Sequence, residues 1–317
     1  MDPHDLNEAV RKTDVDAPTP MNFSPSPSFD DLLFRDEYSG ERPASPVVSV
    51  YNNIEVCSPN GQTKFNQTVV LEEKLGSGCF SDVYKATWNG QLVAVKVLKQ
   101  CANQQKTFER ELAALRRTLG WSSTIQLLGF RSAPCFWIIT NFMNQGTLAS
   151  RIEQQRATGK PFTTDQLLSV AVPLATTLHR LHSLSPPLLH RDLTPDNILF
   201  HDDQLCLGDF GVAVSLYHNP SAQPEGALEA CLSPNGHPDY RAPEVLSGSY
   251  GLPAEVYSFA SVLHAMVSAG SASTADVEAL ACPSWVKRLI GLCWAEPKAR
   301  PTFADILAFL DQVKRAC

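Results

Sequence analysis

A change of hydrophobic pattern near residue 160 is the feature of this 317-residue chain that most constrains its fold. Before that point, short runs rich in Val, Ile and aromatic residues are separated by Gly and Asn, a pattern typical of β-strands. Beyond it, apolar residues recur every three or four positions or fill long runs, as they do in helices. A strand-rich half followed by a helix-rich half predicts an α+β protein of two lobes with a cleft between them.

The individual elements follow from the same patterns. Asn89-Gly90 indicates a hairpin turn, because both residues tolerate a positive φ. Phe108, Leu112 and Leu115 recur at helical spacing on one apolar stripe. The predicted strands cover residues 69–75, 83–88, 92–98, 125–130 and 136–141. The predicted helices cover residues 105–119, 164–184, 256–267, 284–293 and 303–313.

The N-terminal stretch differs from the rest of the chain in composition. Residues 1–60 hold eight prolines, and their four Lys and Arg against eleven Asp and Glu account for the whole net charge of −7. Such a stretch cannot bury enough apolar surface to offset the entropy lost on ordering. We therefore predict an acidic, Pro/Ser-rich disordered leader over residues 1–64. We predict a folded domain over residues 69–317, with lobes at 69–140 and 144–317.

Charge, hydropathy and cysteine usage exclude several classes of protein. Residues 61–317 carry 22 basic and 22 acidic side chains, so no basic field indicates a nucleic-acid partner. The longest uncharged apolar run, residues 259–269, is too short for insertion into a membrane, and the N-terminus does not resemble a secretory signal. Nine scattered cysteines without a Cys-x-x-Cys pair indicate reduced thiols. We expect a cytoplasmic protein, with a nuclear location left open.

A glycine-rich turn joins the first two predicted strands. Glycines allow backbone N–H groups of a turn to approach phosphate oxygens closely. This turn lies between two strands, whereas a dinucleotide-binding fingerprint leads from a strand into a helix. Successive side chains of a strand point to opposite faces, so Ala94 and Lys96 lie on the same face of the third predicted strand. The turn and its preceding residue are Leu75, Gly76, Ser77 and Gly78.

Two later clusters carry the groups that phosphoryl transfer needs. His190-Arg191-Asp192 precedes Asn197, and Asp209 opens an Asp-Phe-Gly turn after a predicted strand. Phosphoryl transfer requires a carboxylate that orients the attacking hydroxyl, hard oxygen ligands for Mg²⁺ and a cation near the phosphates. These residues, together with Lys96, supply each of those chemical types.

Taken in order, the motifs resemble the eukaryotic protein kinase signature, which ends in Ala-Pro-Glu, here Ala242-Pro243-Glu244. The resemblance covers residues 69–317, and five ordered motifs make it specific. It implies a bilobal kinase fold, ATP and Mg²⁺ as cofactors, and protein substrates. The run before His190 and the Cys-Trp…Arg-Pro ending look like the tyrosine-kinase-like group, as in Raf and mixed-lineage kinases. The run 240–244 looks more like Ser/Thr kinases.

The resemblance also implies roles for individual residues. Lys96 would contact the α- and β-phosphates and pair with Glu111, Asp192 would be the catalytic base, and Asn197 and Asp209 would ligate Mg²⁺. Arg300 would pair with Glu244. The expected nucleotide-binding residues are Leu75, Gly76, Ser77 and Gly78 of the loop, Val83, Ala94 and Leu199 around adenine, the gatekeeper Thr140, and Asn141 and Met143 of the hinge.

The chain departs from the family pattern at several positions. Thr194 stands in place of the usual catalytic-loop lysine, Ser81 in place of the third loop glycine, and Glu255 in place of a helical aspartate. His237 stands in place of a threonine near the Ala-Pro-Glu motif. One hypothesis is that His237 and Thr194 exchange the roles of donor and cation. The alternative, which we favour, is that His237 is an exposed loop residue and Thr194 a tolerated substitution.

Three functions compete for this sequence. The first is an active Ser/Thr protein kinase, with dual specificity left open. The second is a pseudokinase that binds nucleotide or partners without turnover, and the third is a kinase-fold enzyme acting on small molecules. Because all five expected catalytic and metal-binding side chains are present, we favour the active enzyme. Its expected regulators are an upstream kinase and docking partners that act through the leader or the activation segment, where the candidate phosphorylation sites are Ser215, Tyr217, Ser221 and Ser233.

Overall fold

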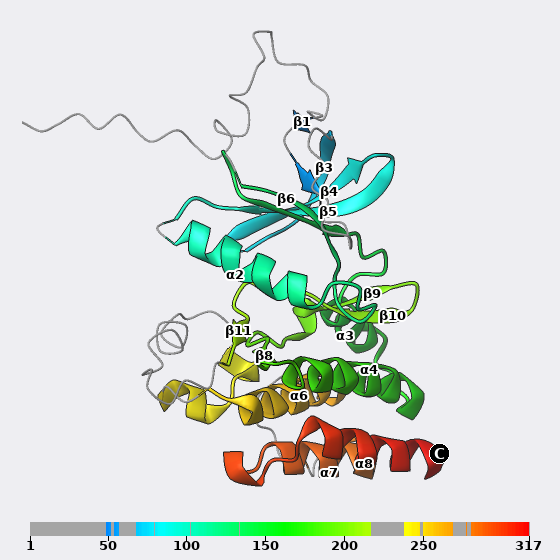
Figure 1. The fold of residues 1–317 in the computed structure, drawn as a ribbon. Coiled ribbons are helices and arrows are strands. Elements are labelled where there is room, and N and C mark those ends of the chain that lie inside the picture. The colour runs from blue at the N-terminus through cyan, green and yellow to red at the C-terminus, as the bar shows by residue number, and fades with distance from the viewer. Residues whose placement is uncertain are drawn as a thin grey trace, which may run out of the picture. The chain divides into compact units, whose positions relative to one another are not determined.

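The computed structural model describes residues 49–51, 54–56, 68–78, 80–101, 103–132, 134–216, 238–247, 250–268, 277 and 280–316. Within the unit Pro43–Cys317, an antiparallel sheet with one helix against it is followed by a helical part (Figure 1). The predicted α+β architecture with a β-sheet N-lobe and a helical C-lobe is therefore confirmed.

The N-lobe is built on a seven-stranded sheet in the order β1-β3-β4-β5-β7-β6-β2. Five of these strands match the predicted ones closely, and the Asn89-Gly90 turn joins β4 to β5 with a positive φ at both residues. The strands are β1 (Ser49–Tyr51), β2 (Glu55–Val56), β3 (Val69–Ser77), β4 (Ser81–Trp88), β5 (Gln91–Leu98), β6 (Leu127–Arg131) and β7 (Trp137–Asn141).

The boundary of the predicted leader needs correction, because β1 and β2 both lie inside residues 1–64. β1 pairs with β3 and β2 pairs with β6, so one short segment occupies both edges of the sheet. Ile54 lies between them and is fully buried. A side chain at Gly129 of β6 would come within 2.8 Å of the Glu55 carbonyl oxygen, so glycine permits this close approach. The remaining leader residues, 1–48, 52–53 and 57–64, lie outside the described part of the chain.

Helix α2 (Gln104–Arg117) lies against the sheet and buries the predicted apolar stripe of Phe108, Leu112 and Leu115 (Figure 1). Phe108 packs on Phe130 of β6 and on Phe136, which precedes β7, with ring centroids 6.0 and 4.7 Å apart. This packing fixes which face of α2 is turned away from solvent. The orientation of every other side chain on α2 follows from it.

The C-lobe is helical, as predicted, and includes one helix that the sequence did not indicate. That helix, α3, carries few apolar residues, but a capping box between Thr147 and Ser150 defines its start. Nearly every side chain of α6 is buried, which explains its continuous apolar pattern. The helices are α3 (Leu148–Thr158), α4 (Thr164–His182), α6 (Leu252–Val267), α7 (Ser284–Cys293) and α8 (Phe303–Ala316).

Short elements between the lobes carry the predicted site. The β9–β10 hairpin and the β8–β11 pair are both antiparallel. Every helix in the described ranges is too short or too polar to cross a membrane. The short elements are β8 (Leu188–Leu189), β9 (Ile198–His201), β10 (Gln204–Leu207), β11 (Val214–Ser215), and the 3₁₀ turns η1 (Pro195–Asn197), η2 (Pro238–Tyr240), η3 (Pro243–Ser247) and η5 (Pro297–Ala299).

Candidate active site

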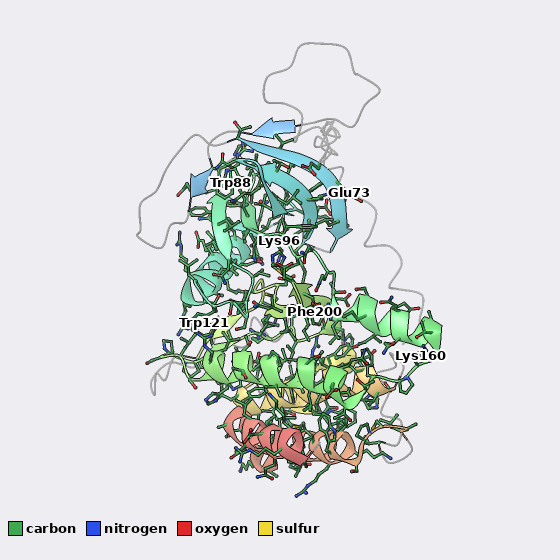
Figure 2. The ribbon with its side chains drawn as sticks, turned by 90° about the vertical axis from the view of Figure 1, so that its right-hand side faces the viewer. Glu73, Trp88, Lys96, Trp121, Lys160 and Phe200 are labelled. Carbon is green, nitrogen blue, oxygen red and sulfur yellow. The ribbon has the colours of Figure 1, made fainter. Side chains whose placement is uncertain are left out.

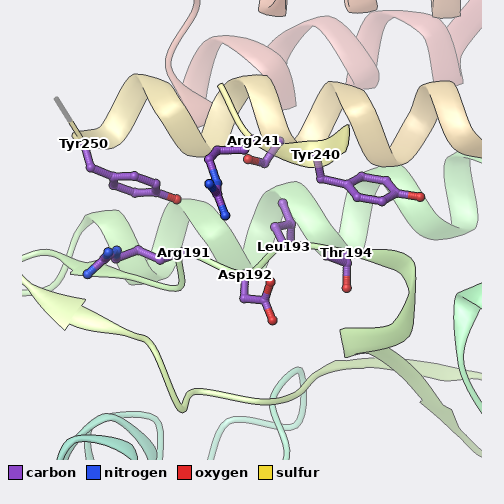
Figure 3. A pocket seen from close by; sticks show the side chains of 8 residues that line it. Arg191, Asp192, Leu193, Thr194, Tyr240, Arg241 and Tyr250 are labelled. Carbon is purple, nitrogen blue, oxygen red and sulfur yellow. The ribbon is translucent and has the colours of Figure 1, made fainter. Parts of the chain in front are cut away.

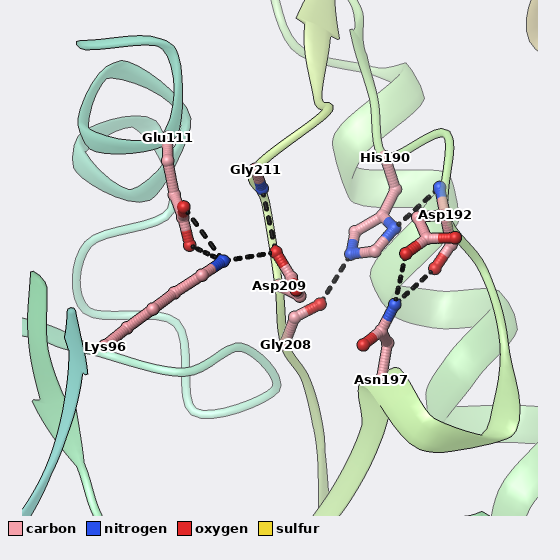
Figure 4. Close-up of polar contacts among 8 residues, drawn as sticks. All are labelled: Lys96, Glu111, His190, Asp192, Asn197, Gly208, Asp209 and Gly211. Carbon is pink, nitrogen blue, oxygen red and sulfur yellow. Dashed lines mark hydrogen bonds and ion pairs between the residues drawn. The ribbon is translucent and has the colours of Figure 1, made fainter. Parts of the chain in front are cut away.

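Lys96 is the centre of an ionic cluster that joins the two lobes, in which Glu111 is buried and Lys96 and Asp209 are partly exposed. It projects from β5 at the junction of sheet and helices (Figure 2). Its Nζ lies 2.9 and 3.0 Å from the two carboxylate oxygens of Glu111 on α2 and 2.7 Å from Oδ1 of Asp209 (Figure 4). The expected pairing of Lys96 with Glu111 is therefore present, and Glu109 is exposed, as predicted.

The glycine of the Asp-Phe-Gly turn is required by this cluster. Asp209 adopts a φ of 52°, and its Oδ1 accepts a hydrogen bond from the Gly211 N–H at 3.1 Å. A Cβ at Gly211 would lie 3.0 Å from Asp209 Oδ1, 3.3 Å from Glu111 Oε2 and 3.4 Å from Lys96 Nζ. A larger residue would therefore crowd all three charged groups at once.

Burial and charge set the protonation of this cluster. Burial by itself would lower the pKa of Lys96, but Asp209 and Glu111 outweigh it and hold that pKa above its ordinary value. Burial raises the pKa of Glu111 to about 7, because Lys96 offsets only part of the desolvation and Asp209 adds repulsion. Burial would also raise the pKa of Asp209, yet the bonds from Lys96 and Gly211 hold it below its ordinary value. Lys96 and Asp209 are thus charged at neutral pH.

The loop after β8 carries the predicted catalytic base. Asn197 Nδ2 donates to both the backbone carbonyl and Oδ2 of Asp192, each at 2.8 Å (Figure 4). His190 is fully buried, receives the Asp192 N–H at Nδ1 and contacts the Gly208 carbonyl through Nε2 at 2.7 Å. Burial raises the pKa of Asp192 above its ordinary value, although His190 and Asn197 act in the opposite direction. The loop therefore holds the Asp192 carboxylate in one orientation.

The predicted nucleotide-binding side chains come from strands that are paired with one another. Val83 of β4 lies opposite Lys96, and Ala94 of β5 lies opposite Thr140 of β7. Leu199 of β9 lies so close to Gly208 that a Cβ at that position would require the end of the Leu199 side chain to move. Leu75 is half-exposed beside Gly76, Ser77 and Gly78, and Met143 is buried.

The Asn141 side chain is committed to the sheet. Its Oδ1 accepts the Gln126 N–H at 2.7 Å, and its own N–H donates to the Gln126 carbonyl at 3.2 Å. The expected contact of Asn141 with adenine cannot use its Oδ1 or its backbone N–H, because Gln126 engages both.

Comparison with known proteins agrees with this geometry. The family profile described as "Protein kinase domain" matches residues 69–308, which is more than half of the chain. The chain belongs to the protein kinase family.

Two kinases from Dictyostelium discoideum are among its relatives. The chain is 28% identical over 273 residues to "Dual specificity protein kinase pyk3", a match that covers 80% of this chain and 19% of that protein. It is 29% identical over 281 residues to "Probable serine/threonine-protein kinase roco7", which covers 78% of this chain and 10% of that protein. The kinase described here thus spans about a tenth to a fifth of the length of these relatives.

Protein kinases use ATP and a divalent metal, and the side chains of this kinase fit both groups. Asn197 turns its Nδ2 toward Asp192, which directs its carbonyl oxygen the other way (Figure 4). Asp209 uses Oδ1 for Lys96 and Gly211, so its second carboxylate oxygen is the one available to a metal. Amide and carboxylate oxygens are the ligands that hard divalent cations prefer.

The kinase fold explains the unusual Glu255 on α6. Its Oε1 accepts the Arg191 backbone N–H at 2.7 Å, and its Oε2 lies 2.8 Å from Nε2 of His182 at the end of α4. Burial would raise the pKa of Glu255, but the contacts with His182 and Arg191 hold it below its ordinary value. Glu255 thus anchors the loop that carries Asp192. The pairing of His182 with Glu255 was not predicted from sequence, because the two residues lie 73 positions apart in the chain.

A small pocket of the kinase lies directly beside Asp192 (Figure 3). Thr194, which replaces the usual lysine, is buried in its wall, opposite Tyr240 and Arg241. Burial raises the pKa of Tyr240 to about 12, and nearby carboxylates reinforce the effect. His237 is the other residue of the hypothesis that Thr194 exchanges the roles of donor and cation, and it lies outside the described residues.

Arg117, the last residue of α2, ties the helix that carries Glu111 to the activation segment. Its Nη1 donates to Ser215 Oγ of β11 at 2.7 Å, and its Nη2 donates to the Pro186 carbonyl. Ser215 is the only candidate phosphorylation site within the described residues, since Tyr217, Ser221 and Ser233 fall outside them. Sequence reasoning missed Arg117, because its partners lie 69 and 98 residues away.

Proposed function

We propose that this chain is a Ser/Thr-specific protein kinase of the tyrosine-kinase-like group that uses Mg²⁺. The observation that carries the proposal is the cluster of Lys96, Glu111 and Asp209 facing the Asp192–Asn197 pair (Figure 4). The pseudokinase alternative is not supported, because every one of these groups is in place and both relatives are named as kinases.

Each side chain then has a chemical role. ATP would supply the phosphoryl group, and Asn197 and Asp209 would hold a divalent ion that would neutralise charge on it. Asp192 holds the substrate hydroxyl and takes its proton while the new oxygen–phosphorus bond forms and the bond to the ADP oxygen breaks. Lys96 binds phosphate oxygens, and Glu111 keeps the Lys96 ammonium in place.

The Ser/Thr preference rests on the run Tyr240-Arg241-Ala242-Pro243-Glu244, which resembles Ser/Thr kinases, and on one relative that is named a probable serine/threonine-protein kinase, whereas the other is named a dual specificity kinase. The proposed domain boundaries are residues 69–317, and the segment Ser49–Val56 adds strands to its sheet. We also propose a cytoplasmic location, consistent with free thiols at the described cysteines. Docking partners or an upstream kinase are proposed to act through the leader.

The test is phosphate transfer from labelled ATP-Mg²⁺ to a generic protein substrate, followed by phosphoamino-acid analysis. Wild type should label Ser and Thr, and Asp192→Asn should lose at least about a hundredfold in rate. Asp203→Asn, in the exposed β9–β10 turn, is the matched control and should keep wild-type activity. Label on Tyr alone would refute the preference, label on all three residues would show dual specificity, and no label above Asp192→Asn would refute turnover.

A further inference from the structure

A second cluster of charges lies at the glycine-rich loop, outside the ionic cluster of Lys96. At its centre is Asp82 of β4, which is only 3% exposed. Its Oδ1 accepts a hydrogen bond from Ser77 Oγ at 2.6 Å and lies 3.2 Å from Lys99 Nζ, while its Oδ2 lies 3.1 Å from Lys74 Nζ. A carboxylate this buried is retained only when donors compensate its desolvation, and here three side chains do so.

Lys99 connects this carboxylate to both arms of the loop. Its Nζ donates to the Gly78 carbonyl at 2.7 Å and to Ser77 Oγ at 3.1 Å. Its backbone N–H donates to the Phe80 carbonyl at 2.8 Å. Lys99, the residue directly after β5, therefore contacts the loop at Ser77 and Gly78 and at Phe80. Through Asp82 it also contacts the strand that follows the loop.

The cluster acts from the side of the sheet that faces away from the nucleotide. Val83 and Lys96 lie opposite each other on β4 and β5, and both are expected at the nucleotide. Since successive side chains of a strand point to opposite faces, Asp82 points away from the face that Val83 uses. Asp82 and Lys99 thus affect a bound nucleotide only through the backbone of the loop. Burial would raise the pKa of Asp82, but its donors hold that pKa below the ordinary value.

We propose that Asp82 and Lys99 form a staple that holds the glycine-rich loop in its phosphate-binding conformation. The departure at Ser81 fits this role, since the loop lacks its third glycine and has less backbone freedom to adapt to a ligand. A loop that already holds its binding conformation loses less entropy when a ligand binds. Affinity therefore rises for the ligand atoms that the loop contacts. The staple therefore strengthens binding of the phosphates and leaves binding of the adenosine moiety unchanged. This inference rests on the proposed function, because it takes ATP as the ligand.

The experiment compares the affinity of the full chain for Mg²⁺-ADP with its affinity for adenosine by titration calorimetry. Asp82→Asn and Lys99→Met should weaken ADP binding by about tenfold, the size expected for loss of a charge-assisted hydrogen bond. Both variants should bind adenosine as wild type does, and Lys99→Arg should recover most of the ADP affinity. Glu72→Gln is the matched control, because Glu72 accepts from Thr87 and lies near Lys85 on the same sheet, away from the loop tip.

Each outcome decides the matter. Wild-type ADP affinity in both Asp82→Asn and Lys99→Met overturns the staple, and so does an equal loss for ADP and adenosine, which indicates general destabilisation. Lys99→Met keeps the test decisive if Asp82→Asn does not fold, since the Lys99 side chain is about one-third exposed. If wild type binds adenosine but not ADP, the staple fails together with the proposed function. A staple failure alone leaves wild-type ADP binding intact.

Discussion

Replacement of Arg300 by Met should destabilise the C-lobe by a predictable amount. The Arg300 side chain is 2% exposed, and its two terminal nitrogens donate to the two carboxylate oxygens of Glu244 at 2.5 and 3.0 Å, as the sequence predicted. It also donates to the carbonyls of Ala295 and Pro253 at 2.8 and 3.0 Å. A single guanidinium thus joins η3, the start of α6 and the turn that leads into η5.

The magnitude follows from burial on both sides of the pair. Removing one partner of a buried ion pair costs about 3–5 kcal/mol, because the other charge stays desolvated. The Glu244 side chain keeps 18% exposure, which favours the lower end, about 3 kcal/mol. For a domain of this size each kcal/mol lowers Tm by about 2–4 °C, so Arg300→Met should melt roughly 6–12 °C below wild type.

Two further variants distinguish the loss of the Arg300–Glu244 ion pair from the loss of side-chain volume. Arg300→Lys keeps the charge but not the two parallel hydrogen bonds, so its melting temperature should fall between wild type and Arg300→Met. Arg300→Met combined with Glu244→Met removes the uncompensated carboxylate and should recover part of the loss. Thermal unfolding followed by circular dichroism measures wild type, these three variants and the single variant Glu244→Met, which completes the double-mutant cycle. A drop under about 2 °C for Arg300→Met, or strictly additive effects in the double variant, would refute the reasoning.

Three further predictions concern the site. Lys96→Met should lower kcat by at least about a hundredfold, and a near wild-type kcat would contradict the role of Lys96. Because burial raises the pKa of Glu111 from its ordinary value of 4.5 to about 7 in the folded protein, the contribution of this group to stability is present below pH 4.5 and is lost as pH rises through 7. Between pH 5 and 8 the Tm of wild type should therefore fall relative to that of Glu111→Gln, and parallel Tm profiles would exclude this titration. Arg117→Ala should lower kcat/KM by about tenfold and speed hydrogen exchange along α2, whereas Arg116→Ala, which loses only a contact with Phe130, should do neither.

Local pattern was sufficient for most of the elements and for the identity of the site. The strand and helix periodicities predicted five strands of the sheet and five helices, because an element that buries one face repeats its apolar residues at a fixed spacing. The resemblance to the kinase signature also implied the contact of Glu111 with Lys96, and the position of Glu111 three residues after Phe108 on the helix is compatible with it. The ordered motifs identified the kinase domain before any contact was known.

Other features were decided only by the tertiary structure. Residues 49–51 and 55–56 stand in an acidic, proline-rich leader, and they become strands because the sheet offers two unpaired edges. The partners of Glu255 and Arg117 lie 64 to 98 residues away, and Lys99 reaches Gly78 across 21 residues. The sequence alone does not show which distant donor or acceptor a polar side chain will contact. Packing of the lobes brings these groups together, and the free-energy cost of burying them unpaired then fixes the partners.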